Sequence, residues 1–199
     1  NSSRNLAEYD CAILEQMGKN PCLNICFYTS QNFNKDIPGV TVKKIFTYYR
    51  RWFFLKPAFY TFEIFCVIFD IFWSKIEVTH TQWHKLAFVD LIAIKILKKY
   101  GKRTVFTAHN IYPHGANSIQ RFLYKLLLNE FSAVIVHTRE AKVKIGLSDP
   151  MKISVVSHPL IYKKPKPKQT TVSRCYIGLL GKWDGYKRYD KALRVYKPI

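Results

Sequence analysis

Short β-branched and apolar runs alternate with helix-like segments over most of the second half of this chain. The candidate strands span residues 76–79, 104–107, 133–136, 153–157 and 176–180. Each run is short and nearly continuous in apolar or β-branched residues, which is typical of parallel strands buried on both faces. This pattern restricts the chain to folds that are built around a parallel sheet.

The segments between these strands carry helix signals. Residues 84–100 are apolar over three turns and end in lysines followed by Gly101, the usual composition of a helix C-terminus. Residues 118–129 place leucines on one helical face. Thr138 is positioned to cap a third helix, and Gly146 to end it. Strand–helix alternation of this kind predicts right-handed βαβ units, and so an α/β fold with a Rossmann-like parallel sheet and flanking helices.

The two ends of the chain are less regular. Residues 22–29 fit either a strand or a helix that begins at Pro21. Residues 163–168 consist of lysine and proline, which favours an extended linker. We therefore expect an N-terminal domain at 1–162, a linker at 163–173, and the first strand and helix of a second, incomplete domain at 174–199.

A dense aromatic stretch covers residues 48–73. From Pro57 it has helical length, and Lys56, Glu63 and Asp70 recur every seven residues as one polar stripe. Each acidic residue at mid-span would cost a transmembrane helix about 2.5–3.5 kcal/mol. We therefore expect a helix that is buried or that lies on a membrane surface.

The formal net charge is +19, which implies an anionic partner. Arg50 and Arg51 beside Trp52 and Phe53 suit an interface with anionic lipid headgroups. The alternative is a core helix that follows a solvated basic turn. Nucleic acid is not an expected partner, because the basic residues are spread over helix ends, linker and aromatic stretch, and no nucleic-acid-binding motif is present.

Several common site chemistries have no signature in this sequence. The five cysteines include no CxxC pair, which favours a reducing compartment over a disulfide framework. His80 and His84 have a metal-ligand spacing, but no acidic or cysteine ligand accompanies them, so no metal site is expected. The sequence also lacks the GxSxG elbow of serine hydrolases and the GxGxxG dinucleotide fingerprint.

Four of the six histidines stand just past a predicted strand: His80, His109, His137 and His158. Histidine titrates near neutrality, so it can move a proton or hydrogen-bond a sugar hydroxyl or a phosphate. The alternative is that each histidine merely occupies a polar loop. Because the carboxyl ends of parallel strands meet at one sheet edge, where ligands bind, the four together predict a site centred on His109.

A second candidate site is the turn at residues 181–188. It follows a predicted strand, precedes a helix-like segment, and contains Gly181, Lys182 and Lys187. Backbone N–H groups at a helix start, together with lysines, suit a diphosphate. The alternative is an ordinary basic β–α loop.

Taken together, several segments resemble the N-terminal half of bacterial GT-B glycosyltransferases of the group 1, family 4-like type. They are VTHTQW at 78–83, TAHN at 107–110 followed by Pro-His, VIVHT at 134–138 and VVSHP at 155–159. The turn at 181–187 is similar to the G-R-x-x-x-Y-K-G motif that opens the donor-binding domain of that family. Lys182 stands where the family has arginine, and Arg188 where it has glycine, so the bidentate arginine contact to the diphosphate is lost.

The resemblance implies a hexosyltransferase-like enzyme of cell-surface polysaccharide biosynthesis, either lipopolysaccharide or exopolysaccharide. It implies a nucleotide-sugar donor, a glycan or lipid-linked acceptor, no cofactor and no metal, and a position on the cytoplasmic face of the inner membrane. His109 would be the base or hydrogen-bond partner near the reacting sugar. The resemblance assigns to the acceptor side His80, Trp83, Asn110, His114 and His158, and to the donor diphosphate Gly181, Lys182 and Lys187.

Most of the donor-binding domain is missing from this sequence, so the fragment alone is expected to be inactive. Two alternatives to the transferase remain open. The chain would then be a basic module that binds nucleic acid or anionic membranes without catalysis, or an inactive truncated remnant.

Overall fold

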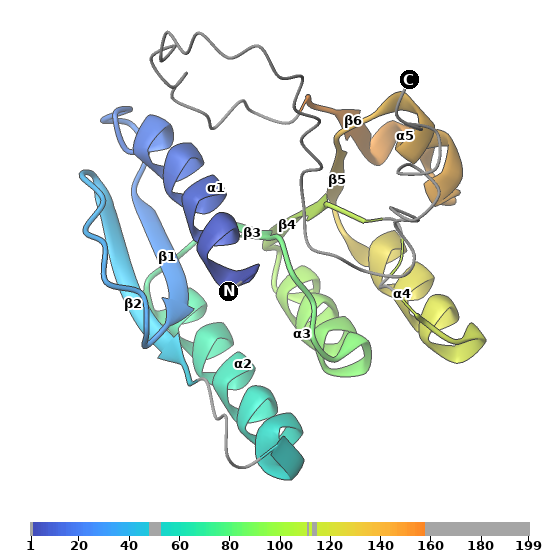
Figure 1. The fold of residues 1–199 in the computed structure, drawn as a ribbon, viewed down its shortest axis with the longest axis horizontal. Helices are drawn as coiled ribbons and strands as arrows, with labels where there is room; N and C mark the ends of the chain where they lie inside the picture. Colours follow the sequence, from blue (N-terminus) through green and yellow to red (C-terminus); the bar gives the residue numbers. More distant parts are fainter. Residues whose placement is uncertain (1, 48–52, 111, 113–114, 158–199) are drawn as a thin grey trace, which may run out of the picture. The chain divides into compact units, whose positions relative to one another are not determined.

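The computed structural model describes residues 2–47, 53–110, 112 and 115–157 (Figure 1). Within these ranges the chain is an α/β protein, with parallel strands in two sheets and helices packed against them. The expected linker and second domain, at 163–199, lie outside the described residues.

The described elements follow one another in a regular α/β order. They are α1 (Ser2–Met17), β1 (Ile25–Ser30), β2 (Val40–Phe46), η1 (Phe53–Leu55), α2 (Lys56–Trp73), β3 (Val78–Thr81), α3 (Ala87–Lys99), β4 (Arg103–Ala108), α4 (Ser118–Glu130), β5 (Ala133–Val136), α5 (Arg139–Ile145), η2 (Pro150–Lys152) and β6 (Ile153–Val155).

The first sheet consists of β1 and β2, which run parallel, with α1 and α2 on its two sides (Figure 1). Successive side chains of a strand point to opposite faces. Phe27 of β1 accordingly packs in a cluster around Cys11 of α1. Its neighbour Tyr28 points the other way, and its hydroxyl donates to Asp70 of α2 at 2.5 Å.

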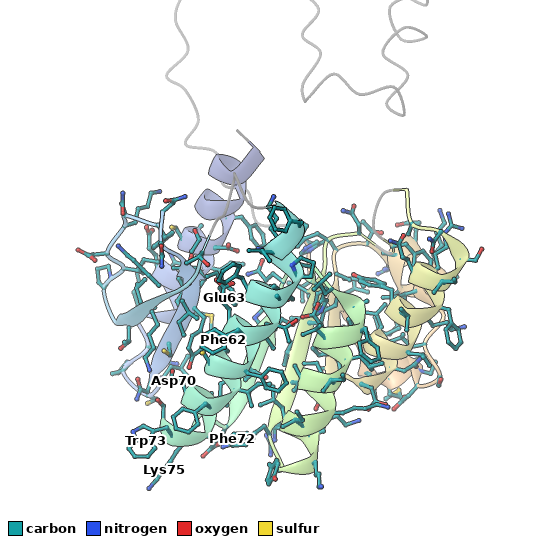
Figure 2. All side chains as sticks on the ribbon, turned by 90° about the horizontal axis from the view of Figure 1, so that it is seen from below. Phe62, Glu63, Asp70, Phe72, Trp73 and Lys75 are labelled. Atoms are coloured by element: carbon teal, nitrogen blue, oxygen red, sulfur yellow. The ribbon has the colours of Figure 1, made fainter. Side chains whose placement is uncertain are left out.

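The second sheet holds β3, β4, β5 and β6 in that order, all parallel. Helices α2, α3 and α4 lie side by side as one layer (Figure 2). The main core lies between this layer and the second sheet, where Leu127, Phe131, Val134 and Val136 are fully buried. Burial of one such side chain contributes about 1.5–3 kcal/mol.

Local signals fix the helix ends. Asn117 and Gln120 form a reciprocal capping box at the start of α4, a type of cap that contributes about 1 kcal/mol. As predicted, the Thr138 side chain caps α5 by accepting from the Ala141 N–H, and Gly146 ends this helix in the left-handed region at φ 57°.

Four of the five predicted strands are found, with some shifts, and the fifth, at 176–180, lies outside the described residues. The strand expected at 133–136 is β5, whereas the one expected at 76–79 begins two residues later, at Val78. The shift arises because the residues after α2 still bond to the helix. The Ile76 N–H donates to the Ile71 carbonyl, and Lys75 turns the chain with a φ of 53°. The ambiguous segment 22–29 contains a strand, β1, and the sequence did not predict α1 or β2.

The expected single sheet is divided in two. The strand order is β2-β1, then a break, then β3-β4-β5-β6. A cavity of about 710 Å³, lined by every residue of β1 and of β3, separates these two strands. The chain runs outward from β1 to β2 and then crosses back to β3, so the break lies where the strand order reverses. In open α/β sheets that reversal is where ligands bind.

Candidate functional site

His109 directly follows β4 and is held by two side chains from neighbouring strand ends. Its Nε2 lies 3.0 Å from the Gln82 amide oxygen, and its Nδ1 lies 3.3 Å from the Nε2 of His137. Gln82 directly follows β3 and His137 directly follows β5. Three adjacent parallel strands therefore bring these side chains into one cluster, which we call the imidazole cluster (Gln82, His109 and His137).

The hydrogen bonds determine which ring nitrogens carry protons. The amide oxygen of Gln82 can only accept, so in this bond His109 Nε2 is the donor. The Val156 carbonyl, 2.9 Å away, likewise requires a proton on His137 Nδ1. With these two protons in place, the contact between His109 Nδ1 and His137 Nε2 is a hydrogen bond only when one of the two rings carries a second proton. While the Gln82 bond stands, His109 cannot take up a proton at Nε2. His109, which the sequence resemblance suggests as a base, is thus a hydrogen-bond donor at Nε2 in this structure.

Two aromatic side chains fix the orientation of the imidazole cluster. The Trp83 indole stacks on the His109 ring, with centroids 5.0 Å apart and an interplanar angle of 10°. The buried Tyr9 ring, from α1, meets His109 edge-on at 5.0 Å. Ring pairs of this kind are worth about 0.5–1.5 kcal/mol beyond the area they bury. Trp83 itself remains 46% exposed, so it also presents surface to a ligand.

Asp10, next to Tyr9 in α1, is the acidic residue of this region. Burial raises the pKa of its carboxyl to about 6, and a hydrogen bond from the Gln82 side chain opposes this rise. Its Oδ1 is buried and has no hydrogen-bond partner among the described residues. A carboxylate that titrates near neutral pH and has an unused acceptor atom is a feature of binding and catalytic sites.

His80 is positioned differently from the expectation. It lies inside β3 and not past its end, in register with Val105 of β4. Its Nε2 is 2.8 Å from the Thr107 hydroxyl, and burial lowers the pKa of its imidazole. His80 therefore faces the cavity as a neutral polar group near the imidazole cluster.

The cavity between the two sheets has mostly apolar walls and a few polar groups. Its apolar lining comes from α1, β1, α2 and α3, and its polar lining includes Asp10, His80, Gln82 and Asp90. The volume of about 710 Å³ falls within the ~300–1,000 Å³ range that small-molecule sites have. Asp10 and Gln82 belong both to the cavity lining and to the surroundings of His109, so the cavity opens beside the imidazole cluster.

His84 and Asp90 form a second pair of polar side chains in the lining of the same cavity. His84 Nδ1 is 3.4 Å from Asp90 Oδ2, and the Tyr60 hydroxyl donates to Asp90 Oδ1 at 2.5 Å. Burial and the Asp90 charge raise the pKa of Tyr60. The His84 ring packs 4.4 Å from Phe106. His84 therefore packs in the core and does not start a helix, because α3 begins at Ala87.

The remaining predicted site residues are placed as follows. Asn110 is exposed directly beside His109. Phe53 opens η1, and its side chain is outside the described residues. Also outside are His114, His158, Gly181, Lys182, Lys187, Arg50, Arg51 and Trp52. The proposed donor-diphosphate site and most of the proposed membrane-contact segment are therefore not described.

The polar stripe of α2 faces inward. Asp70 binds Lys43 of β2 at 2.6 Å, and this ammonium lowers the pKa of the carboxyl. The buried Glu63 accepts hydrogen bonds from the Thr47 N–H and hydroxyl. Tyr60 is buried and Phe72 packs against the main core, but four other aromatic side chains of the helix are exposed. They are Phe62, Phe65, Phe69 and Trp73, which we call the α2 aromatic face (Figure 2).

Sequence reasoning missed Tyr9 and Asp10 and gave no role to Gln82. Gln82 could have been found, because it follows its strand at the same edge at which His109 follows the next one. Asp10 lies on a helix that the sequence did not predict, and it reaches the site only through tertiary packing. No local pattern marks it.

Within the described ranges, no three histidine, cysteine or acidic side chains converge as metal ligands. In the same ranges, no helix combines the length and the apolar character that crossing a bilayer requires. Cys22, Cys26 and Cys66 carry thiols that form no disulfide. Comparison of the sequence with protein-family models and with curated proteins finds no match.

Proposed function

We propose that this chain is the acceptor-side part of a glycosyltransferase that moves a sugar from a nucleotide-sugar donor to a hydroxyl of a glycan or lipid-linked acceptor. The observation that carries the proposal is the cluster of Gln82, His109 and His137 at the carboxyl ends of three adjacent parallel strands. The sequence resemblance points to the same place, because the motifs that carry it contain Gln82, His109 and His137.

The proposed chemistry is proton transfer at the acceptor hydroxyl as the glycosyl bond forms. An acceptor hydroxyl that displaces the Gln82 carbonyl would meet His109 Nε2, and the Trp83 indole offers an apolar surface to a sugar ring. Nε2 can accept the hydroxyl proton once the ring proton of His109 is on Nδ1, from which it is donated to His137 Nε2. The acceptor oxygen would then bond to the sugar as the nucleoside diphosphate of the donor leaves. A positioned acid–base group contributes about 10²–10⁴ in rate. The donor would bind through residues 181–187.

The test is transfer of radiolabel by the full-length protein from a panel of nucleotide sugars to lipid acceptors in membranes. His109→Ala should reduce transfer by at least about 10², and Lys187→Ala should raise the KM for the donor. Tyr100→Ala, an exposed side chain just past the end of α3, serves as the control and should transfer at the wild-type rate. Transfer by His109→Ala at the wild-type rate would exclude the proposed site.

A second candidate function, docking on an anionic membrane surface with or without catalysis, is favoured by the α2 aromatic face. Phe62, Phe65, Phe69 and Trp73 follow helical spacing along the outer side of α2, and Trp73 is 79% exposed. Contiguous exposed apolar side chains mark interaction surfaces. The net charge of +19 complements anionic lipid headgroups, and lysines stand at both ends of the helix, at Lys56 and Lys75.

Flotation with liposomes that contain phosphatidylglycerol tests membrane docking. The triple variant Phe62→Ser, Phe69→Ser, Trp73→Ser should lose most of the binding, and wild-type binding should weaken as salt rises. The double variant Ile119→Ser, Phe122→Ser removes exposed apolar side chains from α4 and is the matched control. Equal flotation of both variants would refute the assignment of the α2 aromatic face.

A further inference from the structure

We propose that the cavity between β1 and β3 is a binding site for an elongated apolar molecule with an uncharged, hydrogen-bond-donating head, such as a long-chain alcohol, and that Asp10 accepts the head group. This goes beyond the proposed transferase function, because it rests on the cavity alone and needs neither a donor nor a transfer reaction.

The first argument is the origin of the cavity. β1 and β3 each pair on one side only, and their other edges face this space. The lining combines side chains from β1, β3 and three helices, among them Leu14, Ile64, Val67 and Ile94. Walls of this kind exclude polar molecules and favour the burial of aliphatic chains, at about 0.8 kcal/mol for each methylene group.

The second argument is the location of unsatisfied polar atoms. In the described part of the chain, three buried side-chain atoms have no hydrogen-bond partner: Asp10 Oδ1, His84 Nε2 and Asp90 Oδ2. All three belong to residues that line this one cavity, although Asp90 Oδ2 also lies 3.4 Å from His84 Nδ1. Buried polar groups in proteins are almost always paired, so unpaired groups that share one cavity indicate a ligand that supplies the missing partners.

The third argument is charge. Besides Cys26, Tyr28 and Tyr60, whose pKa values are raised so that they stay uncharged, the ionisable lining consists of Asp10 and Asp90, the imidazoles of His80 and His84, and Lys85. Lys85 lies over the Tyr60 ring, 5.6 Å from its centroid. Two carboxylates in a mostly apolar space disfavour an anionic head by Coulomb repulsion. The site would thus select against anions although the whole chain carries a charge of +19.

These features explain why Asp10 is the residue that meets the head. Asp90 is already bonded to Tyr60 and lies close to His84, whereas Oδ1 of Asp10 remains unused. Asp10 is also next to Gln82 and so lies at the end of the cavity that opens beside the imidazole cluster. The chain of the ligand would extend from there between β1 and β3.

Isothermal titration of the protein at pH 8 tests the proposal with three probes of equal chain length: 1-decanol, decylammonium and decanoate, each below its micelle concentration. Decanol should bind at least about tenfold more tightly than decanoate, which the carboxylates repel, and more tightly than decylammonium, whose charge would have to leave water for mostly apolar walls. Shortening the chain from decanol to nonanol should weaken binding about fourfold. Binding of decanoate or decylammonium as tight as that of decanol, or no binding of any probe, would overturn the proposal.

Two pairs of variants locate the site. Val78→Phe fills the cavity from β3 and should weaken decanol binding at least tenfold, whereas Val155→Phe, a similarly exposed valine on β6 outside the lining, should not. Asp10→Asn should reduce the preference for decanol over decanoate to about threefold or less, while Asp36→Asn, an exposed aspartate, should leave it unchanged. Equal effects within either pair contradict the site. Because no sugar donor is present, a negative transfer assay leaves this result unaffected.

Discussion

Replacement of Asp10 by asparagine should stabilise the protein at neutral pH and not at acid pH. The carboxyl has a pKa of about 6 in the folded protein, against an ordinary value of 3.8. Because burial raises this pKa, the folded state holds the proton more tightly than the unfolded state does. The cost of ionised Asp10 is therefore absent at low pH, grows between about pH 4 and pH 6, and is constant above that range.

The size of the effect follows from the two pKa values. A difference of about 2 pKa units corresponds to about 3 kcal/mol at pH 7.5, and the same relation gives about 0.6 kcal/mol at pH 4. Asp10 keeps some exposure to solvent, so we expect an observed gain of about 1–3 kcal/mol at pH 7.5. Asparagine retains the oxygen that accepts from Gln82, so the variant removes the charge with little change in shape.

Urea unfolding at pH 4 and at pH 7.5 measures this difference. Asp36→Asn is the control, because it removes one exposed negative charge from the same basic protein. The gain from Asp10→Asn should exceed that of the control by at least about 1 kcal/mol at pH 7.5 and shrink toward zero at pH 4. If the stabilities of Asp10→Asn and wild type differ equally at both pH values, burial does not raise the pKa of Asp10. Asp10 would then not be a carboxylate whose ionisation destabilises the fold.

Two further substitutions, each with a control, test the packing of the fold. Gly39→Ala should lower the free energy of unfolding in urea by about 2–5 kcal/mol, because the φ of Gly39 is 76° and an added Cβ would lie 2.2 Å from the Gly18 carbonyl oxygen. The control, Gly101→Ala, has a similar φ of 74° but open space around it, and should lower the free energy of unfolding by about 1 kcal/mol. Equal losses would contradict the close approach of Gly39 to Gly18. Leu127→Ala should lower the free energy of unfolding by about 2–5 kcal/mol, because the Leu127 side chain is fully buried. Leu126→Ala, at the exposed neighbour on α4, should lower it by under about 1 kcal/mol. Similar losses for the two variants would show that the core is misplaced.

The sequence predicted those parts of the fold that local patterns determine. The strands that became β4 and β5, and the helix caps at Thr138 and Gly146, follow from residue type and spacing alone. β3 was placed two residues early, because residues 74–76 still donate hydrogen bonds to carbonyls of the preceding helix, and apolar character at Ile76 does not reveal this.

The break between the sheets could not be predicted, because it depends on which strand edges meet. β1 has the composition of a strand that could pair on both sides, yet its residues 25–30 pair only with β2. The same limit applies to the site. His109 was found because it follows a predicted strand, whereas Asp10 reaches the cavity from a helix far away in sequence.

The orientation of α2 also depended on tertiary packing. The sequence identified Glu63 and Asp70 as one stripe but did not say which way it faces. In the structure these acids satisfy Thr47, Tyr28 and Lys43 of the first sheet. Because the acids face the first sheet, the residues on the opposite side of the helix, the α2 aromatic face, are exposed.

The central claim, that a sugar acceptor binds at the imidazole cluster, is tested most directly by NMR titration of this chain with methyl hexosides and N-acetylglucosamine. Signals from the Trp83 indole N–H, the His109 ring and the Gln82 side-chain amide should shift together with saturation. The exposed indole of Trp73 on the α2 aromatic face is the internal control and should not shift. If no glycoside shifts the Trp83 and His109 signals more than that of Trp73, the claim is contradicted.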